Sequence, residues 1–576
     1  MTKSNNMGNP GNLKQKALTN LPVILLVLAL LWLIIAFLVY PNLNLLYETF
    51  FGEGYFSGRA FYRIWNSERA MRSLTNSLLL AGSLVVTANV VGIFIVLVTE
   101  YFDIKGAKIL RIGYMTPLVY SGVVLVSGYN FIYGPNGIVT RFLLNLFPYM
   151  DPRWFQGFGA VLFIMTFACT TNHIVFLRAA MKNIDFQTIE AAKNMGANGW
   201  TILRRVVLPV LKPNIFAITV LLFLVGLGAT SAPLIVGGTD FQTINPMIIT
   251  FARTINTRDL AAALSIVLGV ATILVLVVTQ RFEQKNNYKS ISKVKTTLVK
   301  QKIESKIANG MIHTLAYLAF VIFILPILFI VIFSFTDSYS ISTGTLAWQR
   351  FTLENYVALF TQQGAFRPYM MSLIYSGLAA IIVVAIVLVT TRLLHKYKKK
   401  LVFLEYLMMI PWLLPATLIA VGLMVTYDQP HPLIFNQVLI GTYVMLLIGY
   451  VIVLIPFTLR MLKAAFYTVD DSLEEAAKSL GSRAFYTFFK VVLPLIMPTV
   501  LAVLVLNFNG RLADFDLTVL LYHPLAETLG ITIWNATGES AGANARAMML
   551  VYSVILMLLS TTALYLVYGR KQEETQ

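Results

Sequence analysis

Stretches of roughly 20 apolar residues recur along the whole of this 576-residue chain. A helix needs about 20 such residues to cross the hydrocarbon core of a bilayer, where every backbone polar group must be paired inside the segment. Charged residues make up 12% of the chain, against about 25% in a soluble globular domain. The pattern therefore predicts an all-α, polytopic membrane protein with about twelve transmembrane helices. The predicted spans cover approximately residues 21–40, 78–98, 109–131, 159–177, 214–236, 260–278, 311–335, 371–393, 402–427, 435–458, 495–512 and 547–568.

One short polar sequence occurs twice between these apolar runs. Residues 190–196 read EAAKNMG, and residues 475–481 read EAAKSLG. In each copy the sequence VVLP follows at the same distance, at 206–209 and at 491–494. Each copy must lie in a polar loop at the membrane surface, and we call these two segments the Glu-Ala-Ala loops.

A second pair of matches supports an internal duplication. Pro117 precedes Gly128 by the same distance as Pro411 precedes Gly422, and each pair lies in the predicted third span of its half. These matches predict two homologous halves of six spans each. The halves are parallel repeats because each begins and ends on the same side of the membrane.

Lysine and arginine are distributed unevenly over the predicted loops. If the amino terminus is cytoplasmic, every lysine lies in a cytoplasmic loop or tail, and the opposite loops carry arginine but no lysine. This positive-inside pattern predicts a protein of the cell (inner or cytoplasmic) membrane. Both termini and both Glu-Ala-Ala loops are expected to face the cytoplasm. The pattern, together with anionic lipid headgroups, explains the net charge of +18, so we expect a lipid bilayer and no nucleic acid as a partner.

These patterns divide the chain into two halves, a linker and two tails. The segment between the halves is strongly basic, rich in polar residues and without apolar periodicity, which is typical of a linker. The predicted parts are a cytoplasmic tail (1–20), a first half (21–280, core 76–278, loop 178–213), a basic cytoplasmic linker (281–306), a second half (307–568, core 372–567, loop 460–498) and a cytoplasmic tail (569–576).

Each Glu-Ala-Ala loop carries start and stop signals for a short helix. In the first loop Asp185 and Thr188 can cap a helix that EAAKNM continues, and Gly196 ends it because glycine readily adopts the left-handed conformation. The second loop repeats this design, with Asp470 among its candidate caps and Gly481 at its end.

A second amphipathic stretch follows each short helix. In the first loop it covers residues 200–211, and Pro213 is expected to begin the return into the bilayer. Pro494 and Pro498 are expected to mark the same return in the second loop.

The pattern of EAA, three residues, G, nine residues, V, one residue and LP resembles the cytoplasmic coupling loop of permease subunits in binding-protein-dependent ABC importers. Two copies indicate two such subunits fused in one chain, with the type I importer permease fold. The resemblance implies two separate ABC ATPase subunits on the cytoplasmic side and an extracellular or periplasmic solute-binding protein on the other side. It also implies that ATP and Mg²⁺ are used by those ATPase subunits and that this chain binds no cofactor itself.

The resemblance further implies a role for each residue type in the loops. The glutamates would contact a groove of the ATPase, the alanines would allow close approach, and the glycines would permit the turn. The alternative for each glutamate is a stabilising charge near a helix N-terminus, worth about 0.3 to 1 kcal/mol. The residues given the ATPase-coupling role are Glu190, Ala191, Ala192, Gly196, Glu475, Ala476, Ala477 and Gly481.

The sequence predicts neither catalysis nor a metal site. It contains no Gly-Lys dipeptide, and therefore no GxxxxGK[ST] phosphate-binding loop, so ATP hydrolysis is assigned to partner subunits and the chain is not expected to be an enzyme. Cys169 is the only cysteine, and the histidines share no ligand spacing.

An ion-coupled secondary transporter is the alternative class, because such proteins also have about twelve spans in duplicated halves. They usually place ionisable groups at mid-membrane. Here such groups are few: Glu405 lies near one end of the predicted ninth span, and a small charged cluster lies near the end of the eleventh. The alternative also leaves the two Glu-Ala-Ala loops unexplained.

Two further runs bear on the cargo. Residues 514–522, with 527–529 after them, and residues 226–234 are similar to permeases of the ferric-iron branch, in which fused halves are common. Ferric iron is therefore the first expectation for the transported solute. Thiamine, aminoethylphosphonate, sulfate and polyamine importers share much of the architecture and stay open.

Polar residues in the spans near the pseudo-twofold axis are candidates for lining the path. A polar group buried in a bilayer costs free energy unless it is paired or faces water. Hydrogen bonding between helices is an equally good explanation for the asparagines. The candidate path residues are Tyr129, Asn130, Asn507 and Asn509.

A charged cluster near the outer end of the predicted eleventh span is a candidate gate. It consists of Arg511, Asp514 and Asp516. An ion-paired cap at the membrane interface is the alternative role.

Overall fold

The computed structural model describes residues 24–52, 54–118, 122–181, 184–285, 299–396, 398–538 and 540–568. Within these residues the regular structure is helical, and the strand-like pairs are isolated bridges. Ten helices there are long and apolar enough to cross a membrane, and two bent helix pairs raise the number of candidate spans to as many as 12. The predicted all-helical membrane fold is thus confirmed. The predicted tails 1–20 and 569–576, and residues 286–298 of the predicted linker, lie outside the described residues.

The first half begins with a long helix, Ile24–Phe51, which contains η1 and α2. Here α marks α-helices and η marks π-helical or 3-10 turns. The elements are η1 (Ile35–Val39), α2 (Tyr40–Phe51), α3 (Arg59–Trp65), α4 (Glu68–Val96), η2 (Leu97–Tyr101), α5 (Ala107–Tyr114), η3 (Thr116–Leu118), α6 (Gly122–Tyr133), α7 (Ile138–Leu146), α8 (Phe158–Cys169), α9 (Thr171–Met181), α10 (Phe186–Asn194), α11 (Gly199–Ile202), η4 (Leu203–Val207), α12 (Leu208–Leu227), α13 (Ser231–Val236), α14 (Ile244–Ala252), η5 (Ile255–Thr257) and α15 (Arg258–Lys285).

The second half repeats most of this order after residue 305. Its elements are α16 (Lys306–Ser334), α17 (Ser338–Thr343), η6 (Trp348–Arg350), α18 (Glu354–Thr361), α19 (Arg367–Lys396), α20 (Lys398–Met409), η7 (Ile410–Trp412), α21 (Ala416–Thr426), η8 (Pro432–Ile434), α22 (Tyr443–Phe466), α23 (Asp471–Ser479), α24 (Ala484–Thr487), η9 (Phe488–Val492), α25 (Leu493–Leu512), α26 (Thr518–Leu521), η10 (Pro524–Ala526), α27 (Leu529–Asn535) and α28 (Ala543–Tyr568).

The third span of each half is broken, whereas the sequence predicted single spans at 109–131 and 402–427. Leu401–Trp412 and Ala416–Thr426 meet at 104°, and Ala107–Leu118 and Gly122–Leu146 meet at 111°. Prolines lie at the breaks in both halves, at Pro117 and at Pro411, and each sits in a 3-10 turn. A proline lacks the backbone N–H that would continue the α-helical ladder, which explains why neither span is straight.

The predicted tenth span, 435–458, is displaced along the chain. The spanning helix α22 starts only at Tyr443, because residues before it form a turn in which Phe435 and Asn436 both have positive φ. That turn is closed by a bridge between His431 and Gln437. Periodicity alone extended the apolar run into this turn.

The return into the bilayer also differs from the prediction. Gly199–Leu227 and Phe485–Leu512 are each one continuous helix, so the stretch 200–211 is not a separate helix and Pro213 lies inside α12. Continuity is possible because a π-helical turn precedes the first proline in each case: the amide of Leu208 donates to Leu203, and that of Leu493 to Phe488. The wider i to i−5 turn accommodates the proline that follows.

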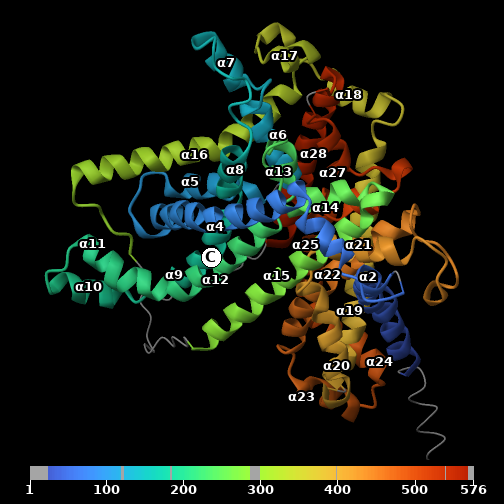
Figure 1. Ribbon diagram of the computed structural model, residues 1–576. Coiled ribbons are helices and arrows are strands. Elements are labelled where there is room, and N and C mark those ends of the chain that lie inside the picture. The colour runs from blue at the N-terminus through green and yellow to red at the C-terminus, as the bar shows by residue number, and fades with distance from the viewer. Residues whose placement is uncertain are drawn as a thin grey trace, which may run out of the picture.

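The two halves exchange their first helices. The helix Ile24–Phe51 packs against α21 of the second half, and α16 packs against α5 and α6 of the first half as well as against α28 of its own half, as Figure 1 shows for α16 and α5. Leu30, Ile34 and Leu38 accordingly belong to the hydrophobic core of the second half. Each half therefore depends on a helix from the other for its packing.

The exchange explains the glycines that recur in the third spans. A Cβ at Gly128 would lie 2.8 Å from the side chain of Ile330 on α16, and one at Gly422 would lie 3.2 Å from the carbonyl oxygen of Pro41. Both glycines thus allow the exchanged helix to approach closely. Tyr114 on α5 also donates a hydrogen bond of 2.7 Å to the carbonyl of Ala316 on α16.

The Glu-Ala-Ala helices lie at separate extremities of the molecule. In Figure 1, α10 and α11 form the left end, and α23 and α24 form the lower end. We call the side of the molecule that carries these helices the Glu-Ala-Ala end, and the side that carries α17 and α18 the opposite end. The contacts between halves instead involve elements such as α6 with α27, and α21 with α14 and α15.

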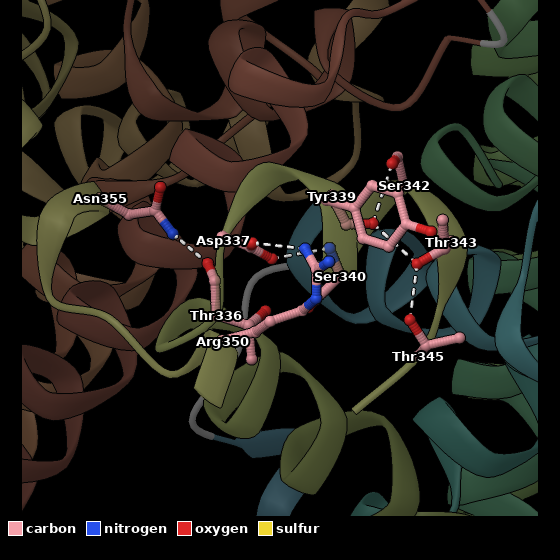
Figure 2. A network of polar contacts seen from close by, with 9 residues as sticks. All are labelled: Thr336, Asp337, Tyr339, Ser340, Ser342, Thr343, Thr345, Arg350 and Asn355. Carbon is pink, nitrogen blue, oxygen red and sulfur yellow. Dashed lines mark hydrogen bonds and ion pairs between the residues drawn. The ribbon is translucent and has the colours of Figure 1, made fainter. Parts of the chain in front are cut away.

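A polar network fixes the loop that follows α16 at the opposite end (Figure 2). Asp337 caps α17 by accepting a hydrogen bond of 2.8 Å from the amide of Ser340, and it forms an ion pair of 2.9 Å with Arg350. The Arg350 guanidinium lies 4.0 Å from the centre of the Tyr339 ring. These hydrogen bonds, that to the Ser340 amide first, hold the pKa of Asp337 below its usual value.

Candidate functional site

The two Glu-Ala-Ala helices have closely similar local geometry. Asp185 accepts a hydrogen bond of 3.1 Å from the amide of Gln187 at the start of α10, and Asp470 accepts one of 2.9 Å from Ser472 at the start of α23. Asp185 and Asp470 are therefore the caps among the candidates that the sequence offered. The hydrogen bonds to Ser472 lower the pKa of Asp470.

Both helices end at a glycine in the left-handed conformation. The φ angles of Gly196 and Gly481 are +80° and +82°. Next to them, the amide of Ala197 donates to the carbonyl of Ala192 at 3.0 Å, and the amide of Ser482 donates to that of Ala477 at the same distance. These bonds satisfy carbonyl groups at the helix end and turn the chain sharply, as the glycines predicted.

The exposed faces of α10 and α23 also match. Glu190 and Ala191 are exposed on α10, whereas Ala192 faces inward. Glu475 and Ala476 are exposed on α23, and Ala477 is half-buried. Each half thus presents a glutamate beside a small residue, an arrangement that leaves the helix backbone accessible to a partner.

Large apolar side chains are exposed beside these faces. Met195 is 82% exposed and Leu480 is 89% exposed, each one residue before its glycine. Trp200 and Phe485 are exposed at the start of the return helices. Such side chains at matching positions in both halves are typical of a surface that is covered by a partner.

The two helices are attached to their halves in different ways, which the sequence did not reveal. In the first half Ile189 on α10 is fully buried in the hydrophobic core. The matching residue of the second half is Glu474, whose carboxylate forms a bidentate ion pair with Arg392 of α19, with one N–O distance of 2.7 Å. Arg392 hydrogen-bonds Glu474 and thereby lowers the pKa of that carboxyl.

The end of the predicted linker also contacts α10. Gln301 bridges to the segment after η2, since its amide donates to Tyr101 at 2.8 Å and its carbonyl accepts from Asp103 at 3.0 Å. Lys193 of α10 donates to the side-chain oxygen of Gln301 at 2.5 Å. The chain that leads into α16 is therefore joined to the first Glu-Ala-Ala helix.

The four candidate path residues lie in different environments. Tyr129 is buried and donates a hydrogen bond of 3.2 Å to the carbonyl of Ile322 on α16, and Asn507 is buried and donates one of 2.8 Å to Thr458. Both therefore form bonds between helices. Asn130 and Asn509, in contrast, each line a cavity.

These two cavities differ in position and charge. The larger, about 620 Å³, lies between α6 and the α27–α28 region, and Arg153 and Arg546 are its charged lining residues. The smaller, about 330 Å³, lies where the broken third span of the first half meets α25 and α28. Asp514 and Asp516 are its charged lining residues.

The candidate gate residues lie together at the end of α25. Arg511 and Asp514 form an ion pair of 2.6 Å, as expected for the ion-paired alternative. Asp516 lines the same cavity as Asp514. Within the described part of the chain, no group of three or more His, Cys, Asp or Glu side chains could hold a metal ion.

The family follows from a match that falls once on each half. A model of the family described as binding-protein-dependent transport system inner membrane component matches residues 17–287 and 395–569. The chain belongs to this family. Since each matched region contains one Glu-Ala-Ala helix, this permease is a fusion of two family repeats. The ion-coupled secondary transporter considered from the sequence is thereby ruled out, and the chain is an ABC importer permease.

Several curated relatives of the permease carry related names. A probable ABC transporter permease protein of Sinorhizobium fredii is 37% identical over 531 residues, covering 92% of this chain and 93% of the relative. A ferric transport system permease protein of Actinobacillus pleuropneumoniae is 26% identical over 508 residues, covering 86% of this chain and 71% of the relative. A spermidine/putrescine transport system permease protein of Haemophilus influenzae is 23% identical over 268 residues, covering 45% of this chain and 97% of the relative.

Proposed function

We propose that this permease binds two separate ABC ATPase subunits, one at α10 and one at α23. The observation that carries the proposal is the presence, in each half, of an exposed Glu-Ala-Ala helix that ends at a left-handed glycine. The ATPases would use ATP and Mg²⁺, and the permease itself would bind neither. A solute-binding protein would deliver the cargo at the opposite end.

Docking would combine charge with apolar contact. Glu190 and Glu475 would contact basic or hydrogen-bonding groups in the ATPase grooves, while the exposed Met195 and Leu480 would be buried there. Ala191 and Ala192, with Ala476 and Ala477 in the other half, would let the groove approach the helix backbone. The positive-inside pattern supports a cytoplasmic location for these docking surfaces and for both termini.

The continuous return helices suit the transmission of force. Because α10 and α23 are each followed by a helix that runs without a break into the membrane region, movement of a docked helix would shift α12 or α25 as a whole. The glycines at 196 and 481 set the angle between the two helices in each pair. The movement caused by ATP-driven closure of the ATPase pair would thus be transmitted through these helices to the contact between the halves.

Ferric iron is the cargo that we propose. Support comes from the similarity over most of the chain to a relative named as a ferric transport permease, and from the carboxylates that line the smaller cavity. The weaker similarity to a polyamine permease keeps spermidine and putrescine as the second candidate, and both candidates are cations.

Charge reversal at both docking helices tests the mechanism. The variant Glu190→Arg with Glu475→Arg should reduce ATP-dependent uptake at least tenfold in cells that also express a cognate ATPase and solute-binding protein, because both ATPase contacts would become repulsive. Glu354→Arg changes the same type of exposed side chain at the opposite end, away from the ATPases, and it should leave assembly with the ATPases intact. Full uptake and normal ATPase assembly in the double variant would refute the docking role.

Uptake measurements with radioactive solutes test the cargo. Cells should accumulate ⁵⁵Fe supplied as a ferric chelate in an ATP-dependent manner, and excess spermidine or sulfate should not compete. Accumulation of spermidine in place of iron would replace the first candidate with the second, and accumulation of sulfate would contradict a cationic cargo.

A further inference from the structure

The smaller cavity lies between the halves and takes its lining from both of them. The first half contributes Leu118 and Gly122, which flank the break in its third span, together with Ser231 at the start of α13. The second half contributes the end of α25, the segment up to Asp516, and one face of α28. A space of about 330 Å³ at this junction is large enough for a small solute with several waters.

Asp514 is committed to the structure of the second half. Its carboxylate forms the 2.6 Å ion pair with Arg511. It also accepts hydrogen bonds from the amides of Leu517 and Thr518, each at 3.3 Å, and from the Thr518 hydroxyl at 3.1 Å. These hydrogen bonds fix the start of α26. The ion pair between Asp514 and Arg511 leaves no net charge on the two side chains.

Asp516 is not neutralised in this way. Among the described residues it forms no ion pair, because the Arg511 guanidinium is bonded to Asp514, and it lines the cavity. With Arg511 and Asp514 paired, Asp516 gives the cavity a net charge of −1. A carboxylate in a membrane protein is costly unless it is paired or faces water. Asp516 meets this condition by lining the cavity, where its carboxylate can contact a cation.

The remaining polar groups around the cavity supply oxygen ligands. Ser231, Asn509 and Ser560 line it, and Asn509 donates a hydrogen bond of 3.3 Å to the carbonyl of Ser560. The hydroxyl and carboxylate oxygens of this otherwise largely apolar lining suit hard, multivalent cations, which prefer such ligands.

We propose that this cavity is a transient binding site for a hard, multivalent cation on its way through the permease, and that Asp516 is the side chain that contacts it. The inference rests on the proposed transport function and adds a cargo-contacting residue to it. A single carboxylate with neutral oxygen ligands holds a cation weakly, and weak holding is what a translocation site needs because the ion must also leave. Because both halves supply its lining, the site is sensitive to the separation of the halves.

The trivalent ion Tb³⁺ is a suitable direct probe, since it is hard, prefers oxygen ligands and is detected by luminescence. The full chain in lipid nanodiscs should show a saturable Tb³⁺ site whose affinity falls at least tenfold in Asp516→Asn, which removes the charge without changing the size of the side chain. Asp516→Glu should retain most of the affinity. Glu354→Gln removes an exposed carboxylate at the end of the molecule opposite the Glu-Ala-Ala helices, and it should leave the affinity unchanged. Equal affinity in the wild type and in Asp516→Asn would overturn the proposal.

Transport measurements separate this proposal from the proposed function. Asp516→Asn should lower ⁵⁵Fe uptake at least tenfold while the solute-binding protein still stimulates the ATPase, because docking is unaffected. If wild-type cells show no ATP-dependent uptake, the proposed function fails, whereas the Tb³⁺ result still decides the cation site. If uptake is ATP-dependent and Asp516→Asn transports as well as the wild type, the function stands and the role of Asp516 is refuted.

Discussion

Removing the carboxylate of Glu474 should loosen α23 selectively. The side chains of Glu474 and Arg392 are only 14% and 18% exposed, and their ion pair is bidentate. Replacing Glu474 with alanine leaves the Arg392 guanidinium largely buried and without its partner. Breaking such a pair costs about 2 to 4 kcal/mol, between the value for a charged hydrogen bond and that for a fully buried pair.

The loss acts locally because the pair joins α23 to α19 and does not lie in the main core. At 1.4 kcal/mol for each factor of ten, the opened state of α23 should become about 30 to several hundred times more populated. The double variant Glu474→Ile with Arg392→Leu should restore most of the stability, since it leaves no unpaired charge and copies the apolar attachment that Ile189 provides to α10.

Hydrogen exchange, measured by mass spectrometry in lipid nanodiscs, reports this change directly. Amides of α23 should exchange faster in Glu474→Ala, while those of α10 keep their wild-type rates. The effect should be seen at neutral pH, because the pKa of the Glu474 carboxyl is lowered in the folded protein. The ion pair therefore contributes its full stabilisation above the ordinary glutamate range. That contribution is lost only as the pH falls through the lower pKa of the folded state. Unchanged exchange at α23, or equal acceleration at α10, would refute the reasoning.

Two further predictions concern packing and pH. Gly226→Ala should destabilise the protein by about 1 to 3 kcal/mol in thermal unfolding, because its Cβ would lie 2.7 Å from the backbone of Ala81. The control Gly82→Ala lies next to Ala81 but has open space around its Cβ, so it should be neutral or slightly stabilising. An equal loss in both variants would contradict the packing argument. The loop closed by Asp337 and Arg350 should stay ordered at neutral pH and loosen only below the usual aspartate range, since the lowered pKa of Asp337 means that its stabilisation is lost as the pH falls through that lower value. Protection factors at α17 that do not change between neutral pH and about pH 2 would show that the ion pair does not hold the loop.

The sequence predicted well those features that depend on short segments. The apolar runs gave the all-helical membrane fold, and Asp185, Asp470, Gly196 and Gly481 gave the ends of the Glu-Ala-Ala helices, because caps and left-handed glycines act within a few residues. Pro117 and Pro411 are present in the sequence, but hydropathy alone predicted one straight span around each of them. The tenth span was misplaced because an apolar turn and an apolar helix end have the same hydropathy.

The candidate path residues show where such reasoning stops. Asn507 and Asn509 are two positions apart in one helix and are identical in type, yet one bonds to Thr458 in the core and the other lines a cavity. Asp514 and Asp516 are likewise two positions apart and identical in type, and only Asp514 forms an ion pair with Arg511. Which of two similar residues faces a neighbouring helix depends on helix rotation and packing, and a single span does not encode that in its hydropathy.

The sequence by itself therefore determined the membrane fold, the duplication and the two Glu-Ala-Ala helices, since each of these rests on local periodicity or on a short motif. Only the tertiary structure decided that the first helix of each half packs against the other half, close to Gly128 and Gly422. It also decided that an ion pair attaches α23 where Ile189 attaches α10, and that Asp516 lines a cavity between the halves. These features depend on which faces of distant helices meet. The free energy of such contacts arises from shape and charge across hundreds of residues of sequence separation, which local pattern does not record.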